Sequence, residues 1–160
     1  MCYNVGKERR TDMSASKKVK TGIAFGFFIP LHKGHEMMIE RAIKENDRAI
    51  IAVCGYRTDR GKDFVDYDTR LRLIREIYKD NKNVKVVRMD DKKLGRDGTF
   101  ARDNWKIWGE ELFAQAGEDP SKGDYCWYTG DESFIEKLSA IYPKHRFVLL
   151  DRSDVPVSSS

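Results

Sequence analysis

The sequence lacks the features that mark membrane, secreted and zinc-binding proteins. No apolar run approaches the roughly 18 residues that a membrane-spanning helix needs, and residues 1–20 contain no apolar segment of the kind found in signal peptides. Only three cysteines occur, Cys2, Cys54 and Cys126, and no two of them form a CxxC pair. They supply neither a disulfide framework nor a zinc site. We therefore expect a soluble, cytoplasmic protein.

Dense charge of one sign is also missing. The formal net charge is +4, and charged residues make up 35% of the chain without a strong basic cluster. This balance makes nucleic acid an unexpected partner and fits a small anionic substrate at least as well. With 160 residues and 40% hydrophobic content, the chain can bury one core. We expect a flexible basic lead-in over residues 1–18 and one domain over residues 19–160.

Strand and helix patterns alternate along the domain. Apolar residues run continuously through RAIIAVCGY, as in a strand buried on both faces, whereas GHEMMIERAIKEN places them on one side of a helix. The alternation predicts an α/β fold, a Rossmann-like doubly wound five-stranded parallel sheet with helices on both faces. Such sheets bind ligands beyond the carboxyl ends of strands, where the winding reverses. The predicted strands are 19–28, 48–56, 83–89, 124–130 and 145–151, and the predicted helices are 34–46, 68–80, 100–117 and 132–142.

The decapeptide GFFIPLHKGH, residues 26–35, ends the first predicted strand and enters the first helix. Gly26 permits a close approach of a ligand to the backbone, and Gly34 opens a helix whose free N–H groups favour phosphate. His32 and His35 can both turn toward that anion and donate hydrogen bonds to it. We interpret the decapeptide as a polyphosphate site. Two alternatives remain: ordinary turn and core residues, and a metal site, for which no third ligand accompanies the histidines.

The decapeptide is a complete GxFxPxHxGH signature, and the chain resembles the nucleotidylyltransferase superfamily from about Thr21 to Ser160. Within that superfamily, CGYRTDRG, NWKIWGEEL, YTGDESF and LLDRSDVPVSSS are most similar to NadR-type nicotinamide-nucleotide adenylyltransferase domains. The resemblance implies that ATP and nicotinamide mononucleotide react to give NAD and pyrophosphate. A phosphate monoester is already a nucleophile at pH 7, so positioning and charge stabilisation suffice for this reaction.

The resemblance also assigns residues to the ATP side of the site. His32 and His35 are the expected catalytic residues, which brace the phosphates as pyrophosphate leaves, and Lys33 adds a point charge. Mg²⁺ is expected on the ATP phosphates, with no dedicated protein cage. Gly130 and Asp131 are assigned to the nucleotide, although turn and helix-cap chemistry explains them equally well. The expected ATP-binding residues are Gly26, Phe27, Phe28, His32, Lys33, His35, Gly130, Asp131, Val157, Ser158 and Ser160.

The acceptor side is expected around a pair of tryptophans. Trp105 and Trp108 share a helix face, and an indole can stack on the flat, cationic nicotinamide ring; ordinary core packing is the alternative. Three cations follow the second strand, and one of them is expected to hold the acceptor phosphate unless they form a solvated loop. Arg70 either reaches inward from the next helix or makes a surface ion pair. The expected acceptor-binding residues are Asn104, Trp105, Trp108, Arg57, Arg60 and Lys62.

The last segment departs from the family pattern. Relatives close the ATP site with the pattern (I/V)-S-x-(T/S)-x-I-R, and residues 157–160 match only its beginning, so the ATP motif is incomplete in this sequence. In NadR-type proteins a ribosylnicotinamide kinase domain often follows. That further domain and a homo-oligomeric state stay open.

Two other function classes also stay open. The first is another nucleotidylyltransferase of the superfamily, which uses CTP or an acceptor such as pantetheine phosphate or glycerol phosphate. The tryptophan pair argues against those acceptors. The second is a non-catalytic nucleotide-binding regulatory module, which the incomplete C-terminal motif suggests.

Overall fold

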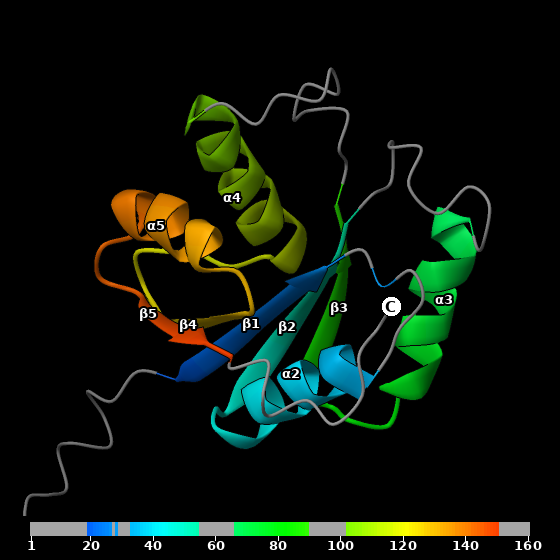
Figure 1. The fold of residues 1–160 in the computed structure, drawn as a ribbon. Helices are drawn as coiled ribbons and strands as arrows, with labels where there is room; N and C mark the ends of the chain where they lie inside the picture. Colours follow the sequence, from blue (N-terminus) through cyan, green and yellow to red (C-terminus); the bar gives the residue numbers. More distant parts are fainter. Residues whose placement is uncertain (1–18, 27, 29–32, 55–65, 90–101, 151–160) are drawn as a thin grey trace, which may run out of the picture.

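The computed structural model describes residues 19–26, 28, 33–54, 66–89 and 102–150, without the side chains of residues 102–104. The predicted lead-in over residues 1–18 lies outside this part. Within it, strands and helices alternate in the predicted order (Figure 1). The strands are β1 (Lys20–Gly26), β2 (Arg48–Val53), β3 (Val84–Arg88), β4 (Asp124–Thr129) and β5 (Arg146–Leu149), and the helices are α2 (Lys33–Lys44), α3 (Tyr67–Ile77), α4 (Arg102–Ala116) and α5 (Glu132–Ile141).

The strands form one parallel sheet in the order β3-β2-β1-β4-β5. Gly26 at the end of β1 lies beside Val53 of β2, and Ala24 lies beside Tyr128 of β4. The chain therefore moves outward from β1 first in one direction and then in the other. This order confirms the doubly wound parallel sheet and places the reversal of winding between β1 and β4.

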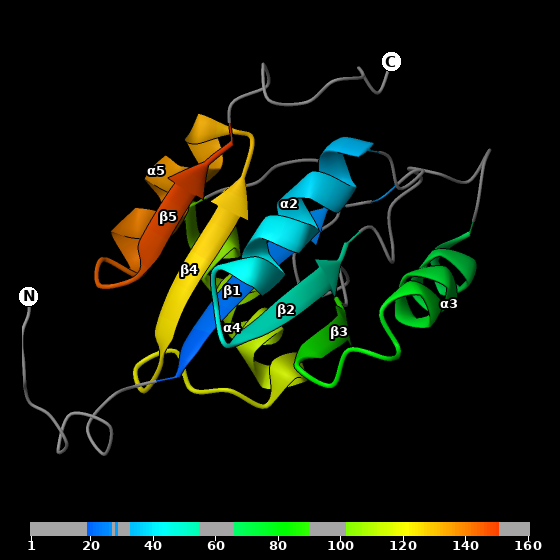
Figure 2. The same ribbon diagram turned by 90° about the horizontal axis from the view of Figure 1, so that it is seen from below.

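Helices cover both faces of the sheet, as predicted. Figure 2 shows α2 crossing in front of the strands and α4 behind them. On the first face, α2 and α3 bury Met38, Ile39, Leu71 and Ile74 against the sheet; on the second, α4 and α5 bury Leu112, Phe113 and Leu138. Side chains of one strand alternate between the two cores, so β2 is apolar and buried at every position from Ala49 to Val53.

Local signals set the helix ends. Asp66 caps α3, since its carboxylate accepts a hydrogen bond from the Thr69 N–H at 2.8 Å. Gly117 ends α4 in the left-handed region, with a φ of 70°, as its position after the last apolar residue predicts. None of the helices in the described ranges is long and apolar enough to cross a membrane.

His145 is a half-buried residue between α5 and β5, packed among aromatic rings. Its ring lies parallel to that of Tyr142, with 4.8 Å between the ring centroids. Trp127 Nε1 donates to His145 Nδ1 at 3.0 Å, so the ring proton must lie on Nε2, which is 2.8 Å from the Pro120 carbonyl oxygen. Burial holds the pKa of this imidazole below its usual range, partly opposed by the Pro120 carbonyl and by Asp124.

We predict that His145 makes the folding stability depend on pH. A histidine with a lowered pKa in the folded state contributes stability that is complete above its unfolded pKa, about 6.5, and is lost as the pH falls toward the folded value. The free energy of unfolding, measured in urea, should fall more between about pH 7.5 and 5.5 for the wild type than for His145→Gln. The nearby carboxyls of Glu118 and Asp119 titrate below this range because hydrogen bonds lower their pKa values. Parallel pH curves for the two proteins would contradict the prediction.

Candidate active site

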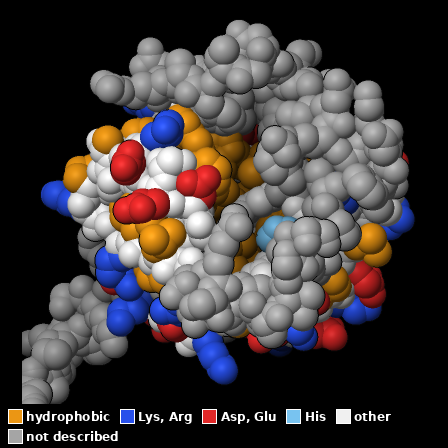
Figure 3. All heavy atoms as spheres, viewed as in Figure 1, with side chains coloured by type: hydrophobic (Ala, Val, Ile, Leu, Met, Phe, Trp, Pro, Cys, Tyr) orange, Lys and Arg blue, Asp and Glu red, His pale blue; other side chains and the backbone are white. Residues whose placement is uncertain are grey.

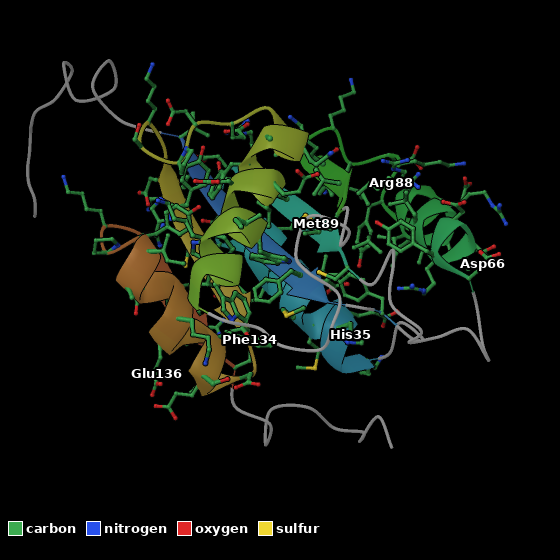
Figure 4. The ribbon with its side chains drawn as sticks, turned by 90° about the horizontal axis from the view of Figure 1, so that it is seen from above. His35, Asp66, Arg88, Met89, Phe134 and Glu136 are labelled. Atoms are coloured by element: carbon green, nitrogen blue, oxygen red, sulfur yellow. The ribbon has the colours of Figure 1, made fainter. Side chains whose placement is uncertain are left out.

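The candidate site lies at the carboxyl ends of β1 and β4, where the winding of the sheet reverses. Figure 4 looks onto this edge, with His35 near its middle, Phe134 on the α5 side and Met89 and Arg88 on the α3 side. Gly26 ends β1, and Thr129 ends β4 immediately before Gly130. The sheet therefore brings the decapeptide and the segment after β4 to the same edge.

Gly26, Phe28 and His35 form one packed unit after β1. Phe28 has a φ of 57°, in the left-handed region that a side chain rarely adopts, and only 1% of it is exposed. Its ring meets the His35 ring edge to face, with 4.9 Å between the centroids. A Cβ on Gly26 would lie 3.3 Å from Phe28 Cε1 and push this ring away. The glycine thus leaves room for the Phe28 ring against His35.

The decapeptide enters α2 at Lys33, one residue earlier than predicted. Lys33 is exposed, and His35 is half-buried in the first turn of this helix. The N–H groups of a first turn have no partner within the helix and carry partial positive charge, so they attract an anion. His35 thus lies where the sequence places a phosphate ligand. A histidine side chain is visible near the middle of the face drawn in Figure 3, and acidic side chains gather over α5.

The β4 side supplies Gly130 and Asp131. Asp131 caps α5, accepting hydrogen bonds from the Ser133 N–H at 2.9 Å and the Ser133 hydroxyl at 2.7 Å. Asp131 therefore does cap the helix, which was the alternative to nucleotide binding, and its contact with the nucleotide stays a prediction. A Cβ on Gly130 would meet no atom of the described residues within 4 Å. The packing of this part of the protein thus leaves space above Gly130.

Gly130→Ala should separate ligand binding from folding. Because the added methyl group meets open space, we expect a melting temperature within about 2 °C of the wild type. If the nucleotide packs on the Gly130 backbone, ATP affinity should fall about tenfold, measured by calorimetry with a non-hydrolysable ATP analogue. Gly22→Ala is the contrasting control, since its Cβ would lie 2.8 Å from the Ala42 carbonyl oxygen and should destabilise the fold. Unchanged ATP affinity in Gly130→Ala would remove Gly130 from the site.

Both tryptophans are buried, which the sequence left open. Trp105 is 5% exposed and Trp108 is 3% exposed, and their rings meet at 5.5 Å between centroids. Trp108 packs deeper, against Phe25 at 5.0 Å and Trp127 at 6.0 Å, which supports a core role for it. Trp105 packs on Phe134, a residue of the first turn of α5, at 5.1 Å. Trp105 thus lies closer than Trp108 to the segment after β4, and its stacking role stays a prediction.

Three further aromatic residues lie at this edge and were not predicted from the sequence: Phe25, Phe134 and Tyr67. Phe25 contacts Phe134 at 5.6 Å, so an aromatic layer joins the end of β1 to the start of α5. Tyr67 binds the ends of β2 and β3 through its hydroxyl. None of them carries a sequence signal, because each role depends on which strand ends become neighbours. Arg70 does reach inward: it is buried, and its Nη1 donates to the Cys54 carbonyl oxygen.

Several predicted site residues lie outside the described part of the chain. The structure places Gly26, Phe28, Lys33, His35, Gly130, Asp131, Trp105 and Trp108. The residues it does not describe, or describes without side chains, are Phe27, His32, Arg57, Arg60, Lys62, Asn104, Val157, Ser158 and Ser160.

The described residues offer neither a metal site nor a pocket that makes a better candidate than this edge of the sheet. No group of three or more His, Cys, Asp or Glu side chains in the described ranges is arranged to hold a metal ion. A shallow hollow of about 440 Å³ lies elsewhere, between α3 and β3. Two of its cations pair with carboxylates, Lys79 with Glu76 and Arg88 with Asp68 at 3.6 Å, as on a solvated surface.

Comparisons with known proteins show which family the chain belongs to. The family model described as cytidylyltransferase-like matches residues 23–160. A Fusobacterium nucleatum protein named "Probable nicotinate-nucleotide adenylyltransferase" is 33% identical over 115 residues, 68% of this chain and 60% of that protein. A phosphopantetheine adenylyltransferase of Francisella philomiragia is 42% identical over 69 residues, 42% of this chain and 41% of that protein. The chain therefore spans only part of the length of these curated relatives.

Solved structures of NadR proteins have the same fold. A NadR protein in complex with NR superposes with a TM-score of 0.70 at 27% identity, covering 86% of this chain and 38% of that one. A NadR protein in complex with NAD and AMP-PNP superposes with a TM-score of 0.67, also at 27% identity, covering 87% of this chain and 41% of that one. The domain described above is thus similar to one part of these longer proteins.

Proposed function

We propose that this chain, which belongs to the cytidylyltransferase-like family, transfers the adenylyl group of ATP to nicotinamide mononucleotide, giving NAD and pyrophosphate. The observation that carries this proposal is the position of His35. It stands in the first turn of α2, shortly after β1 ends at Gly26, at the reversal of the sheet winding. A polyphosphate placed there meets the helix N–H groups and an imidazole donor together.

The proposed chemistry needs few protein groups. The acceptor phosphate oxygen attacks the α-phosphorus of ATP, the bond from that phosphorus to the bridging oxygen breaks, and the electron pair leaves with pyrophosphate. His35 and His32 donate hydrogen bonds to the phosphates as negative charge moves onto the leaving group. Lys33 adds positive charge at the same helix start. No residue has to accept a proton, because the attacking phosphate is already ionised at pH 7.

Mg²⁺ is proposed to arrive with ATP. Oxygen ligands suit this ion, and it commonly keeps several waters while it bridges substrate phosphates. We expect the substrate phosphates and water, rather than a cage of protein carboxylates, to supply its ligands. Its contribution would be charge neutralisation on the phosphates.

Nicotinamide mononucleotide is the acceptor that we favour. A NadR complex contains NAD, and the Fusobacterium relative is named for a nicotinate nucleotide, so pyridine nucleotides recur among similar proteins. Trp105 supplies an indole near the start of α5, and an indole gains from stacking on a cationic ring. The phosphopantetheine relative supports a second candidate acceptor, pantetheine phosphate, which has no ring to stack.

The experiment is adenylyl transfer followed with labelled ATP. The protein, Mg²⁺ and nicotinamide mononucleotide are incubated with ATP carrying the label on the α-phosphate or, in parallel, on the γ-phosphate. Adenylyl transfer puts the α label into NAD and the γ label into pyrophosphate. A γ label found in a phosphorylated acceptor, or no transfer of either label, would refute the proposal.

A further inference from the structure

The first turn of α3 is bound to the carboxyl ends of two strands. The Tyr67 hydroxyl donates to the Val53 carbonyl oxygen at 2.7 Å and accepts a hydrogen bond from the Met89 N–H at 3.1 Å. Tyr67 is itself buried. One phenol oxygen thus joins the end of β2 to the residue that follows β3, and it fixes where α3 begins.

Arg70 extends this contact by one residue along β2. Its Nη1 donates to the Cys54 carbonyl oxygen at 3.1 Å, and its guanidinium lies 5.2 Å from the centroid of the Tyr67 ring. Arg70 is only 4% exposed. Burying a guanidinium costs free energy unless other groups bind its charge and its N–H donors. Well-packed apolar residues can often replace a buried charged residue without loss of stability. Stability alone therefore does not explain an arginine here.

Cys54 passes these contacts on to Gly26 at the end of β1. Its carbonyl oxygen accepts from Arg70, and its N–H donates to the Gly26 carbonyl oxygen at 2.8 Å. That N–H shares a peptide group with the Val53 carbonyl, which accepts from Tyr67, and a donor on the carbonyl side of a peptide strengthens the hydrogen bond that its N–H makes. Arg70 and Tyr67 thus hold the backbone on both sides of the Cys54 Cα. Gly26 is packed on Phe28, and Phe28 on His35. Described contacts therefore run without a break from Arg70 to His35.

We propose that Arg70, oriented by Tyr67, is a positioning residue for adenylyl transfer: it holds the Cys54 carbonyl, so that the Cys54 N–H stays on the Gly26 carbonyl and Phe28 stays packed against His35. Arg70 acts on the phosphates only through these contacts and does not touch the substrates. The functional part of the proposal rests on the proposed function; the structural part does not. Misalignment of His35 weakens the contact with the departing phosphates more than the binding of either substrate.

The first test is a set of single variants. Arg70→Met should lower kcat about tenfold and leave both KM values within about threefold, because the alignment matters most in the transition state. Arg70→Lys, which keeps a charge and a donor, should recover part of that loss. Ile74→Ala is a control for stability, since Ile74 is buried on the same helix. Arg75→Met is a control for chemistry, since Arg75 donates from α3 to the Val86 carbonyl at 3.4 Å. Both controls should keep kcat within about twofold.

The second test asks whether Arg70 acts through His35. In a His35→Ala background, Arg70→Met should lower kcat less than about twofold, because the group that it aligns is gone. Equal effects of Arg70→Met in both backgrounds would overturn the proposal. A fall in kcat in Ile74→Ala that matches the fall in Arg70→Met at equal melting temperature would also overturn it.

Hydrogen exchange keeps this test separate from the proposed function. The Cys54 amide should exchange at least about tenfold faster in Arg70→Met than in Ile74→Ala at equal global stability. Tyr67→Phe, which keeps the ring and removes both hydroxyl contacts, should speed exchange of the Met89 amide in the same way. If the wild type forms no product with any acceptor, the proposed function fails. Exchange of the Cys54 amide then still tests whether Arg70 holds the backbone at Cys54, and unchanged exchange in Arg70→Met would refute that structural role.

Discussion

His35→Ala should lower turnover by about 10² to 10³, the loss expected when one preorganised donor to a developing charge is removed. The imidazole stands in the first turn of α2 and packs on Phe28, so its removal takes away a donor at the phosphates without opening the core. His32→Ala should have a comparable effect, since the same signature assigns it to the same phosphates. Steady-state release of pyrophosphate measures both variants.

The control for this prediction separates the donor from the packing. His35→Gln keeps an N–H donor of similar reach and should give an intermediate rate. Lys44→Met, at the exposed far end of the same helix, should keep the wild-type rate. Turnover within a few-fold of the wild type in both histidine variants, with the fold intact, would contradict the assignment of the phosphate site.

Trp105→Leu should weaken nicotinamide mononucleotide by about 1 to 3 kcal/mol, the size found for bases that stack on aromatic side chains. Leucine keeps an apolar side chain in a position that is 5% exposed, so the fold should lose less stability than with alanine. Binding of an ATP analogue should barely change. Calorimetry with each ligand separately, together with the melting temperature, measures the difference.

Trp108→Leu is the matched variant, because the two indoles lie on one helix face and are buried alike. It should lower the melting temperature by a similar amount and leave both ligands close to their wild-type affinities. If both variants instead weaken both ligands in step with the loss of stability, Trp105 is an ordinary core residue.

Most of the fold follows from local patterns in the sequence. Helices cover both faces of β2, so apolar and polar residues cannot alternate along it, and the apolar run in RAIIAV indicates this from sequence alone. The predicted first strand, residues 19–28, is too long, since β1 ends at Gly26. Phenylalanine favours strands, but Phe28 takes a φ of 57° to fold its ring under His35. Packing against α2 overrides local preference at that position.

The site is less predictable than the fold. The decapeptide points to His35 because its residues are contiguous. The structure places Gly26 at the end of β1 and His35 in the first turn of α2, at the reversal of the sheet winding. The hydroxyl of Tyr67 binds residues 14 positions before it and 22 positions after it. Contacts of this kind exist only once β2 and β3 are neighbours. The tryptophans are difficult for another reason. Trp105 and Trp108 lie three residues apart on one helix face whether their indoles pack in the core or stack on a ligand, so their spacing does not distinguish the two roles.

A competition among acceptors tests the central claim most directly. Equal concentrations of nicotinamide mononucleotide, nicotinate mononucleotide and pantetheine phosphate are mixed with the protein, Mg²⁺ and limiting ATP, and the products are separated and counted. We predict that NAD forms in excess over both other adenylylated products, with one pyrophosphate released for each molecule formed. Preferential adenylylation of pantetheine phosphate, or tight binding of ATP with no product from any acceptor, would contradict the account.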